Sequence, residues 1–168
     1  FGNQRAFRYS LEIETVEAGT MKGLFRKLES ALRKKSLEEF FNRLREQDLE
    51  ASVFLFSLLT DHIASKTNSF TYHSAIAGRR GIFSKDIYER KPVEKVLEPL
   101  GFMKVSRGGR LKTFKLQTNR PNVIRLVNLF KESDNKGDRD KVSEWAGVNL
   151  LRERRMKYSG LTKEKESL

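Results

Sequence analysis

The chain has 168 residues, and 34 Lys and Arg against 22 Asp and Glu give it a formal net charge of +12 at pH 7. It has no cysteine and only two histidines, His62 and His73, which excludes disulfides and thiolate metal sites and argues against a zinc site. No segment approaches the roughly 18 to 20 apolar residues of a membrane span, and the N-terminus does not resemble a signal peptide. The charge favours a polyanionic partner, and the length suits one domain with appended helices.

The first predicted element is a half-buried strand over 7–16. Apolar residues alternate with polar ones there, and Glu12 and Glu14 fall on the polar face. Two carboxylates on one face can hold Mg²⁺ in a nuclease, but the accompanying acid and lysine are missing. A solvated strand face explains the two glutamates, and we prefer that interpretation.

Two amphipathic helices follow. The first, over 21–35, has an apolar stripe that we expect to face the core, formed by Met21, Leu24, Phe25, Leu28 and Leu32. Basic residues lie on the opposite side of this helix, and basic amphipathic helices also bind membranes. Ser36 and Glu39 then have the spacing of a capping box. The predicted buried face of this second helix is Leu37, Phe40, Phe41 and Leu44.

A third helix is predicted over 49–64, with Asp48 as its N-cap. It contains the run VFLFSLL, which has almost no polar face over two turns, so we expect it to be the central helix of the domain. His62 lies one turn beyond this run, and we interpret it as a partly buried capping or packing residue.

The segment 65–91 is the least regular. Lys66 to Ser69 has the composition of a loop, 72–77 suits a short helix, and Ser84 caps another short helix over 85–89. Arg79 and Arg80 lie between glycines, an arrangement that suits phosphate contact because glycine amides approach oxyanions closely and arginine donates paired hydrogen bonds. A solvated turn remains the alternative.

A helix and a β-hairpin are predicted next. Pro92 opens a helix that extends to Leu100, and Gly101 ends it. Strand-like segments over 102–106 and 111–116 flank a turn whose paired glycines permit positive φ; this turn is Arg107-Gly108-Gly109-Arg110.

The order helix, glycine, strand, basic glycine turn, strand resembles the recognition helix and wing of the winged-helix DNA-binding superfamily, over roughly 49–117. In that family the helix before the wing usually enters the major groove, and the wing tip reaches the backbone or the minor groove. The resemblance implies groove-facing roles for Arg90, Lys91, Glu94 and Lys95, and wing-tip roles for Arg107 and Arg110. The helix over 92–100 is short for a recognition helix, so it either inserts into the groove or supports the wing.

The charge is concentrated in this same region. Residues 79–115 contain eleven Lys or Arg and four acidic residues, a net charge of +7. The complete set of predicted DNA-binding residues is Arg79, Arg80, Lys85, Arg90, Lys91, Glu94, Lys95, Lys104, Arg107, Gly108, Gly109, Arg110 and Lys112.

Two more helices are predicted after the hairpin. Pro121 starts the first, with a broad stripe of Ile124, Leu126, Val127, Leu129 and Phe130. The polar segment 132–140 is predicted to be a linker. The last helix, over 139–158, carries Val142, Trp145, Val148 and Leu151 along one side. Trp145 either packs on the domain, which we prefer, or contacts a partner.

The sequence therefore predicts a mainly α protein with a small β-hairpin. We expect a strand and helical extension over 1–47, a winged-helix core over 48–118, C-terminal helices for packing or homodimerisation over 119–158, and a disordered tail over 159–168. Because the sequence begins at Phe1, we expect it to be part of a longer protein.

The expected function is double-stranded DNA binding in transcription regulation or in the initiation of DNA replication or partition. We expect an intracellular protein that has no cofactor and does not bind a membrane. The alternative is a winged-helix protein-interaction module within a nucleic-acid-processing assembly. RNA binding is less favoured, because the few aromatics within 79–115 suit the core better than base stacking. No catalytic motif supports an enzyme.

Overall fold

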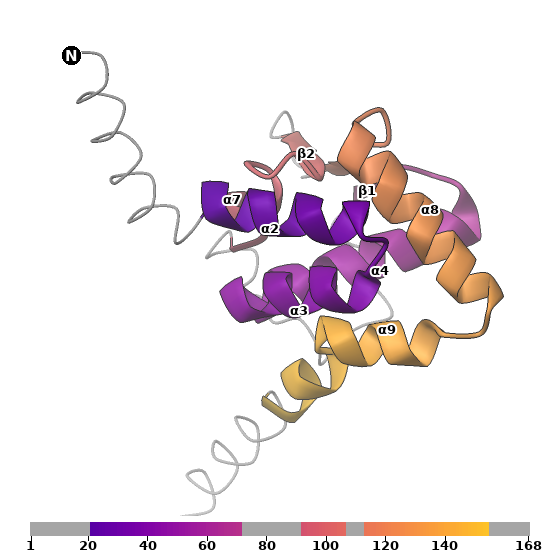
Figure 1. Cartoon of the computed structure of the whole chain (residues 1–168). Helices are drawn as coiled ribbons and strands as arrows, with labels where there is room; N and C mark the ends of the chain where they lie inside the picture. The colour runs from indigo at the N-terminus through magenta and orange to yellow at the C-terminus, as the bar shows by residue number, and fades with distance from the viewer. Residues whose placement is uncertain (1–20, 72–91, 107–112, 155–168) are drawn as a thin grey trace, which may run out of the picture.

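A computed structural model describes residues 21–71, 92–106 and 113–154 of the chain, which are mainly helical with a small three-stranded antiparallel sheet (Figure 1). The predictions for 7–16, for 72–91 and for the hairpin turn fall outside the described residues. The helices are α2 (Lys22–Arg33), α3 (Leu37–Gln47), α4 (Leu49–Ser65), α7 (Pro92–Leu97), α8 (Pro121–Asn135) and α9 (Arg139–Ala146). In these ranges, none of the helices combines the length and the apolarity needed to cross a bilayer.

The helices α2 and α3 lie side by side and are joined by a tight turn (Figure 1). The Ser36 side chain accepts a hydrogen bond from the Glu39 amide at 3.1 Å, as the capping box predicts. The reciprocal half of the box is replaced, because the Ser36 amide donates to the Ala31 carbonyl at 2.9 Å. The Glu39 carboxylate instead lies 3.8 Å from the Lys34 ammonium. Phe25 departs from its predicted place on the core stripe and is 37% exposed.

The helix α4 is the centre of the core, as predicted. Asp48 caps it by accepting a hydrogen bond from the Ala51 amide at 3.0 Å, and every residue from Ala51 to Leu59 is buried. Edge-to-face ring contacts join α4 to the sheet and to α8. The ring centroids of Phe54 and Phe114 of the sheet are 5.2 Å apart, and those of Phe56 and Phe130 of α8 are 5.6 Å apart. One continuous hydrophobic cluster thus joins α4 to the sheet and to the flanking helices.

The sheet has the order β1-β3-β2, formed by β1 (Ser69–Thr71), β2 (Met103–Ser106) and β3 (Thr113–Leu116). The predicted hairpin is present, and Met103 pairs with Leu116 while Ser106 pairs with Thr113. The strand β1 was not predicted, because it has only three residues, of which Ser69 was assigned to the loop over 66–69 and the other two received no assignment. His62 is partly buried, as predicted, and its Nδ1 lies 2.8 Å from the Thr67 carbonyl oxygen between α4 and β1.

The helix α7 ends at Leu97, three residues before the predicted end, and turns at Gly101, which has a φ of +82°. The Phe102 amide donates to the Leu97 carbonyl at 3.1 Å and closes the helix end. Leu100 is buried although it lies outside the helix. The glycine stop was therefore predicted correctly, and the last helical residue was not.

Two predictions for the C-terminal part were wrong. The predicted linker begins too early, because α8 continues to Asn135 and the connection to α9 is only 136–138. The polar residues over 132–135 form the last turn of α8 instead of a linker. The ammonium group of Lys136, which follows this turn, lies 3.5 Å from the Glu132 carboxylate. The predicted single helix over 139–158 is interrupted: α9 ends at Ala146, and a second helical segment runs from 148 to the end of the described residues at 154.

The interruption is at Gly147, which has a φ of +94°. The fully buried hydroxyl of Ser52 in α4 donates to the Ala146 carbonyl at 2.8 Å and satisfies the end of α9. Trp145 is partly buried against the core, in agreement with the prediction that it packs on the domain.

Candidate nucleic-acid interface

Three of the thirteen predicted DNA-binding residues are described by the structure, namely Glu94, Lys95 and Lys104. The other ten lie outside the described residues; they are Arg79, Arg80, Lys85, Arg90, Lys91, Arg107, Gly108, Gly109, Arg110 and Lys112. The geometry of the candidate interface is therefore taken from α7 and from the two strands of the hairpin.

On α7, the two described candidates have opposite environments. Lys95 is exposed, whereas Glu94 is buried with 6% of its surface accessible. Glu94 lies three residues before the fully buried Leu97, on the side of α7 that packs against α4. The groove-facing placement predicted for Glu94 therefore differs from its buried position in the described structure, and its contact with a base stays a prediction.

The solvent face of the hairpin carries two lysines directly opposite each other. Lys104 of β2 pairs in register with Lys115 of β3, and both are exposed. Ser69 of β1 pairs with Lys115 on its other side and is also exposed, so one polar row crosses all three strands. The opposite face is apolar, and Phe70, Val105 and Phe114 form the corresponding buried row.

Sequence reasoning missed Lys115. The alternation Thr113-Phe114-Lys115-Leu116 was available as a signal, because residues two apart in a strand share a face. Pairing Lys115 with Lys104 additionally requires the register of the hairpin, which depends on the turn and cannot be read from either strand alone.

The electrostatics of this pair favour an anionic ligand. Side chains directly opposite each other in an antiparallel pair have Cβ atoms about 5 Å apart, and like charges there are destabilising. Within 21–71, 92–106 and 113–154, no carboxylate forms an ion pair with Lys104 or Lys115. Two ammonium groups on one exposed face, without a compensating acid there, can hold a phosphate between them.

The hairpin is connected to α7 by a side chain. The Glu98 carboxylate, in the turn that follows α7, accepts a hydrogen bond from the Val105 amide of β2 at 2.8 Å. Because β2 is an outer strand of the described sheet, this bond satisfies a donor that β3 does not reach. The position of the two lysines relative to α7 is thereby set by the contact between Glu98 and Val105.

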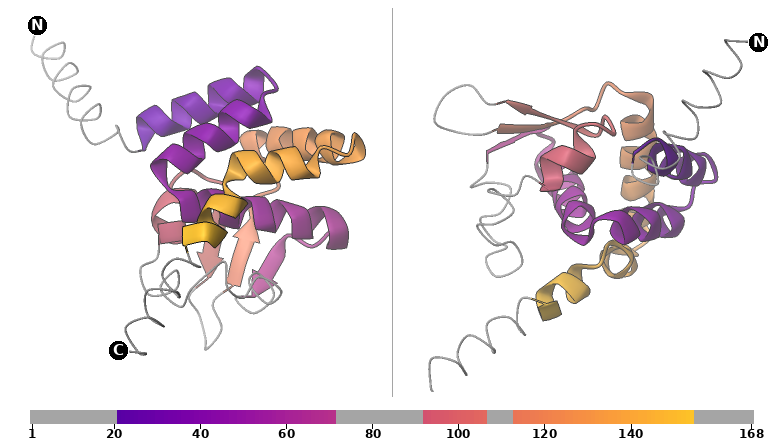
Figure 2. Two further views of the ribbon diagram at one scale, coloured as in Figure 1. Left: turned by 90° about the horizontal axis from the view of Figure 1, so that it is seen from below. Right: turned by 90° about the vertical axis from the view of Figure 1, so that its left-hand side faces the viewer.

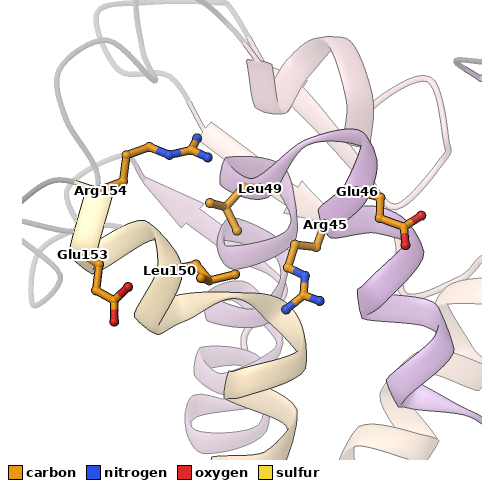
Figure 3. Close-up of a pocket in the computed structure, with 6 residues that line it drawn as sticks. All are labelled: Arg45, Glu46, Leu49, Leu150, Glu153 and Arg154. Carbon is orange, nitrogen blue, oxygen red and sulfur yellow. The ribbon is translucent and has the colours of Figure 1, made fainter.

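A separate groove lies on the other side of the molecule, between the end of α3 and the segment after Gly147 (Figure 3). Leu49 and Leu150 form its apolar part, and Leu150 is 50% exposed. Arg45 and Arg154 line it together with Glu46 and Glu153, so its charge is balanced.

The residues described by the structure contain no cluster of three or more His, Cys, Asp or Glu that could hold a metal ion. Comparisons with models of protein families, with curated protein sequences and with solved structures found no significant match to this chain.

Proposed function

We propose that this chain binds double-stranded DNA through a winged-helix core, with α7 and the β2–β3 hairpin facing the duplex. The observation that carries the proposal is the exposed pair Lys104 and Lys115, which lie opposite each other with no acidic partner in the described ranges. Such a pair is destabilising in the free protein and favourable beside a polyanion.

The order of the elements supports the proposal. A short helix, α7, packs against the central helix α4, and a glycine turn leads from it into an antiparallel hairpin. Figure 2 shows this hairpin extending away from the helical part of the molecule. An extended hairpin fixed to a helix can follow a backbone or enter a groove while the helix is positioned beside it.

The lysines and α7 have different roles in this proposal. Lys104 and Lys115 contact phosphates, which gives affinity without base preference. Lys95 is the described residue of α7 that is exposed and able to donate to a guanine or to a phosphate. The wing arginines Arg107 and Arg110 and the loop arginines Arg79 and Arg80 extend the contact. Such a module serves transcription regulation or the initiation of replication or partition.

A titration of duplex DNA into the protein tests the proposal. We expect duplex binding that weakens steeply between about 50 mM and about 200 mM salt. The Lys104→Gln/Lys115→Gln variant should lose about tenfold in affinity. The matched control is Lys131→Gln/Lys136→Gln, which removes the same charge from the C-terminal part of α8 and from its C-cap residue. Equal losses in both variants would indicate a response to net charge alone and would contradict the proposed interface.

A second proposal concerns the groove of Figure 3, which we suggest contacts a second copy of this chain. Leu150 is one of three large apolar side chains that are exposed within the described ranges. The groove carries arginines and glutamates in equal number, and a two-fold contact can pair each with its opposite. Sedimentation analysis of Leu150→Glu tests it. The variant should be monomeric at a concentration at which the unmodified chain is dimeric, and an unmodified chain that stays monomeric would exclude this contact.

A further inference from the structure

A basic groove lies between α2 and the start of α8, near Gly101. Phe25, Glu29 and Arg33 follow one another at four-residue intervals along α2 and form one side. Asn122 and Arg125 of α8 form the other side, and the segment around Gly101 and Arg120 closes one end. Figure 2 shows the strands of the hairpin running away from α2 and α8.

The single acid of the groove is already compensated. The Glu29 carboxylate lies 3.3 Å from the Arg33 guanidinium and accepts a hydrogen bond from the Asn122 amide at 3.3 Å. Arg125 donates to the neutral Asn122 side-chain oxygen at 3.2 Å. In the part of the chain that the structure describes, no carboxylate pairs with Arg120 or Arg125. The groove therefore retains two positive charges.

Arg120 lies beside Gly101 at the end of the groove. It is the N-cap residue of α8, yet its side chain makes no capping bond. The side chain lies along Gly101, near enough that a Cβ at Gly101 would be 3.6 Å from its Nη1. Arg120 is an exposed residue that lines the groove.

An aromatic ring lies beside these cations. Phe25 is 37% exposed, although its position on α2 predicts burial. A ring next to guanidinium groups is the combination by which proteins bind unpaired nucleotides, since the ring stacks on a base and the cations contact the phosphates. The bases of a duplex are covered on both faces, so only an unpaired base can stack on Phe25.

We infer that this groove binds a short stretch of single-stranded DNA. An acidic peptide has the same charge, but peptide anchors insert an apolar side chain into a pocket lined by several apolar groups. Here Leu100 is buried below the surface, and Phe25 is the one large apolar side chain lining the groove that is exposed. A flat base, in contrast, needs only one exposed ring on which to stack, and Phe25 provides it. The inference is independent of duplex binding at the hairpin.

Fluorescence of a Phe25→Trp variant tests the inference, because an indole is quenched when a base stacks on it. The probe is an oligothymidylate, and the signal of the chain's single native tryptophan is subtracted using the unmodified protein. We expect quenching that saturates with the oligonucleotide. Unchanged fluorescence at saturation, or the same change on adding polyglutamate, would overturn the inference. An oligouridylate arm distinguishes DNA from RNA, and tighter binding of uridylate would overturn the assignment to DNA.

Affinity measurements on matched variants locate the site. Phe25→Ala should bind oligothymidylate about tenfold more weakly. Arg120→Gln/Arg125→Gln should reduce the salt slope of single-strand binding by about 1.4, since each phosphate contact contributes about 0.7. The control Lys131→Gln/Lys136→Gln should leave that slope unchanged. The groove variants should keep their affinity for duplex DNA, and Lys104→Gln/Lys115→Gln should keep its affinity for the single strand. Equal losses of both affinities in the groove variants would overturn the inference that the groove is a separate binding site.

Discussion

The Glu98 carboxylate accepts a hydrogen bond from the Val105 amide at 2.8 Å and so connects the end of α7 to the outer strand of the hairpin. This contact joins the two elements that the proposed interface needs in a fixed relation. Without it, the Val105 amide would face away from β3 with no acceptor from the ladder.

Replacing Glu98 by Ala should destabilise the protein by about 1 to 2 kcal/mol, because a partly buried amide loses a charged acceptor. Glu98→Gln should recover most of this, since an amide oxygen can accept the same bond. Urea unfolding measures the stability, and hydrogen exchange at the Val105 amide reports the contact directly. The control is Glu46→Ala, which removes an exposed partner of Arg43 and should cost less than about 0.5 kcal/mol. Unchanged exchange at Val105 in Glu98→Ala would contradict this role.

Replacing Gly147 by Ala should destabilise the protein by about 2 to 4 kcal/mol. The residue has a φ of +94°, and a Cβ there would overlap the Leu49 side chain and lie 2.9 Å from the Arg45 Cδ. Gly137→Ala is the matched control, because Gly137 has a φ of +79° but no atom within 4 Å of an added Cβ. Its cost should be the backbone cost alone, about 1 kcal/mol. Equal thermal unfolding shifts in the two variants would show that the contact with α3 and α4 does not matter.

The incomplete capping box at Ser36 predicts unequal effects for its two residues. Ser36→Ala should cost about 1 kcal/mol, because the Glu39 amide loses its acceptor. Glu39→Ala should cost less than about 0.5 kcal/mol, since the Ser36 amide is already satisfied by Ala31 and Glu39 retains only a surface ion pair with Lys34. Chemical unfolding of both variants checks this, and equal costs would mean that Glu39 completes the box in solution.

Local signals predicted a large part of the fold. The caps at Ser36 and Asp48, the apolar helix α4 and the glycine stop at Gly101 all depend on residues within a few positions of one another, and each is present. The hairpin was predicted for the same reason, because its two strands are adjacent in sequence.

The errors concern features that depend on distant residues. The helical spacing of Val142, Trp145, Val148 and Leu151 continues across Gly147, and this periodicity hid the local stop signal of the glycine. Distant contacts accompany the interruption, namely the bond from Ser52 and the close approach of Arg45 and Leu49 to Gly147. The strand β1 is formed by pairing with β3, more than forty residues later in the chain, and its own sequence is too short to predict it. Glu94 belonged to the polar residues of α7, yet the packing of α7 on α4 buries it.

The candidate site was only partly predictable for the same reason. Lys95 and Lys104 were selected for their charge beside the expected wing, and the structure leaves both exposed. The pairing of Lys104 with Lys115 required the register, and the α2–α8 groove joins residues that are about ninety positions apart, as the contact between Glu29 and Asn122 shows.

The salt dependence of duplex binding tests the central claim most directly. If Lys104 and Lys115 each contact one phosphate, replacing both by Gln should reduce the magnitude of the slope of log K against log salt by about 2. The Lys131→Gln/Lys136→Gln control should keep the slope of the unmodified protein. A Lys104→Gln/Lys115→Gln variant with an unchanged slope would contradict the proposal that the hairpin face lies against DNA.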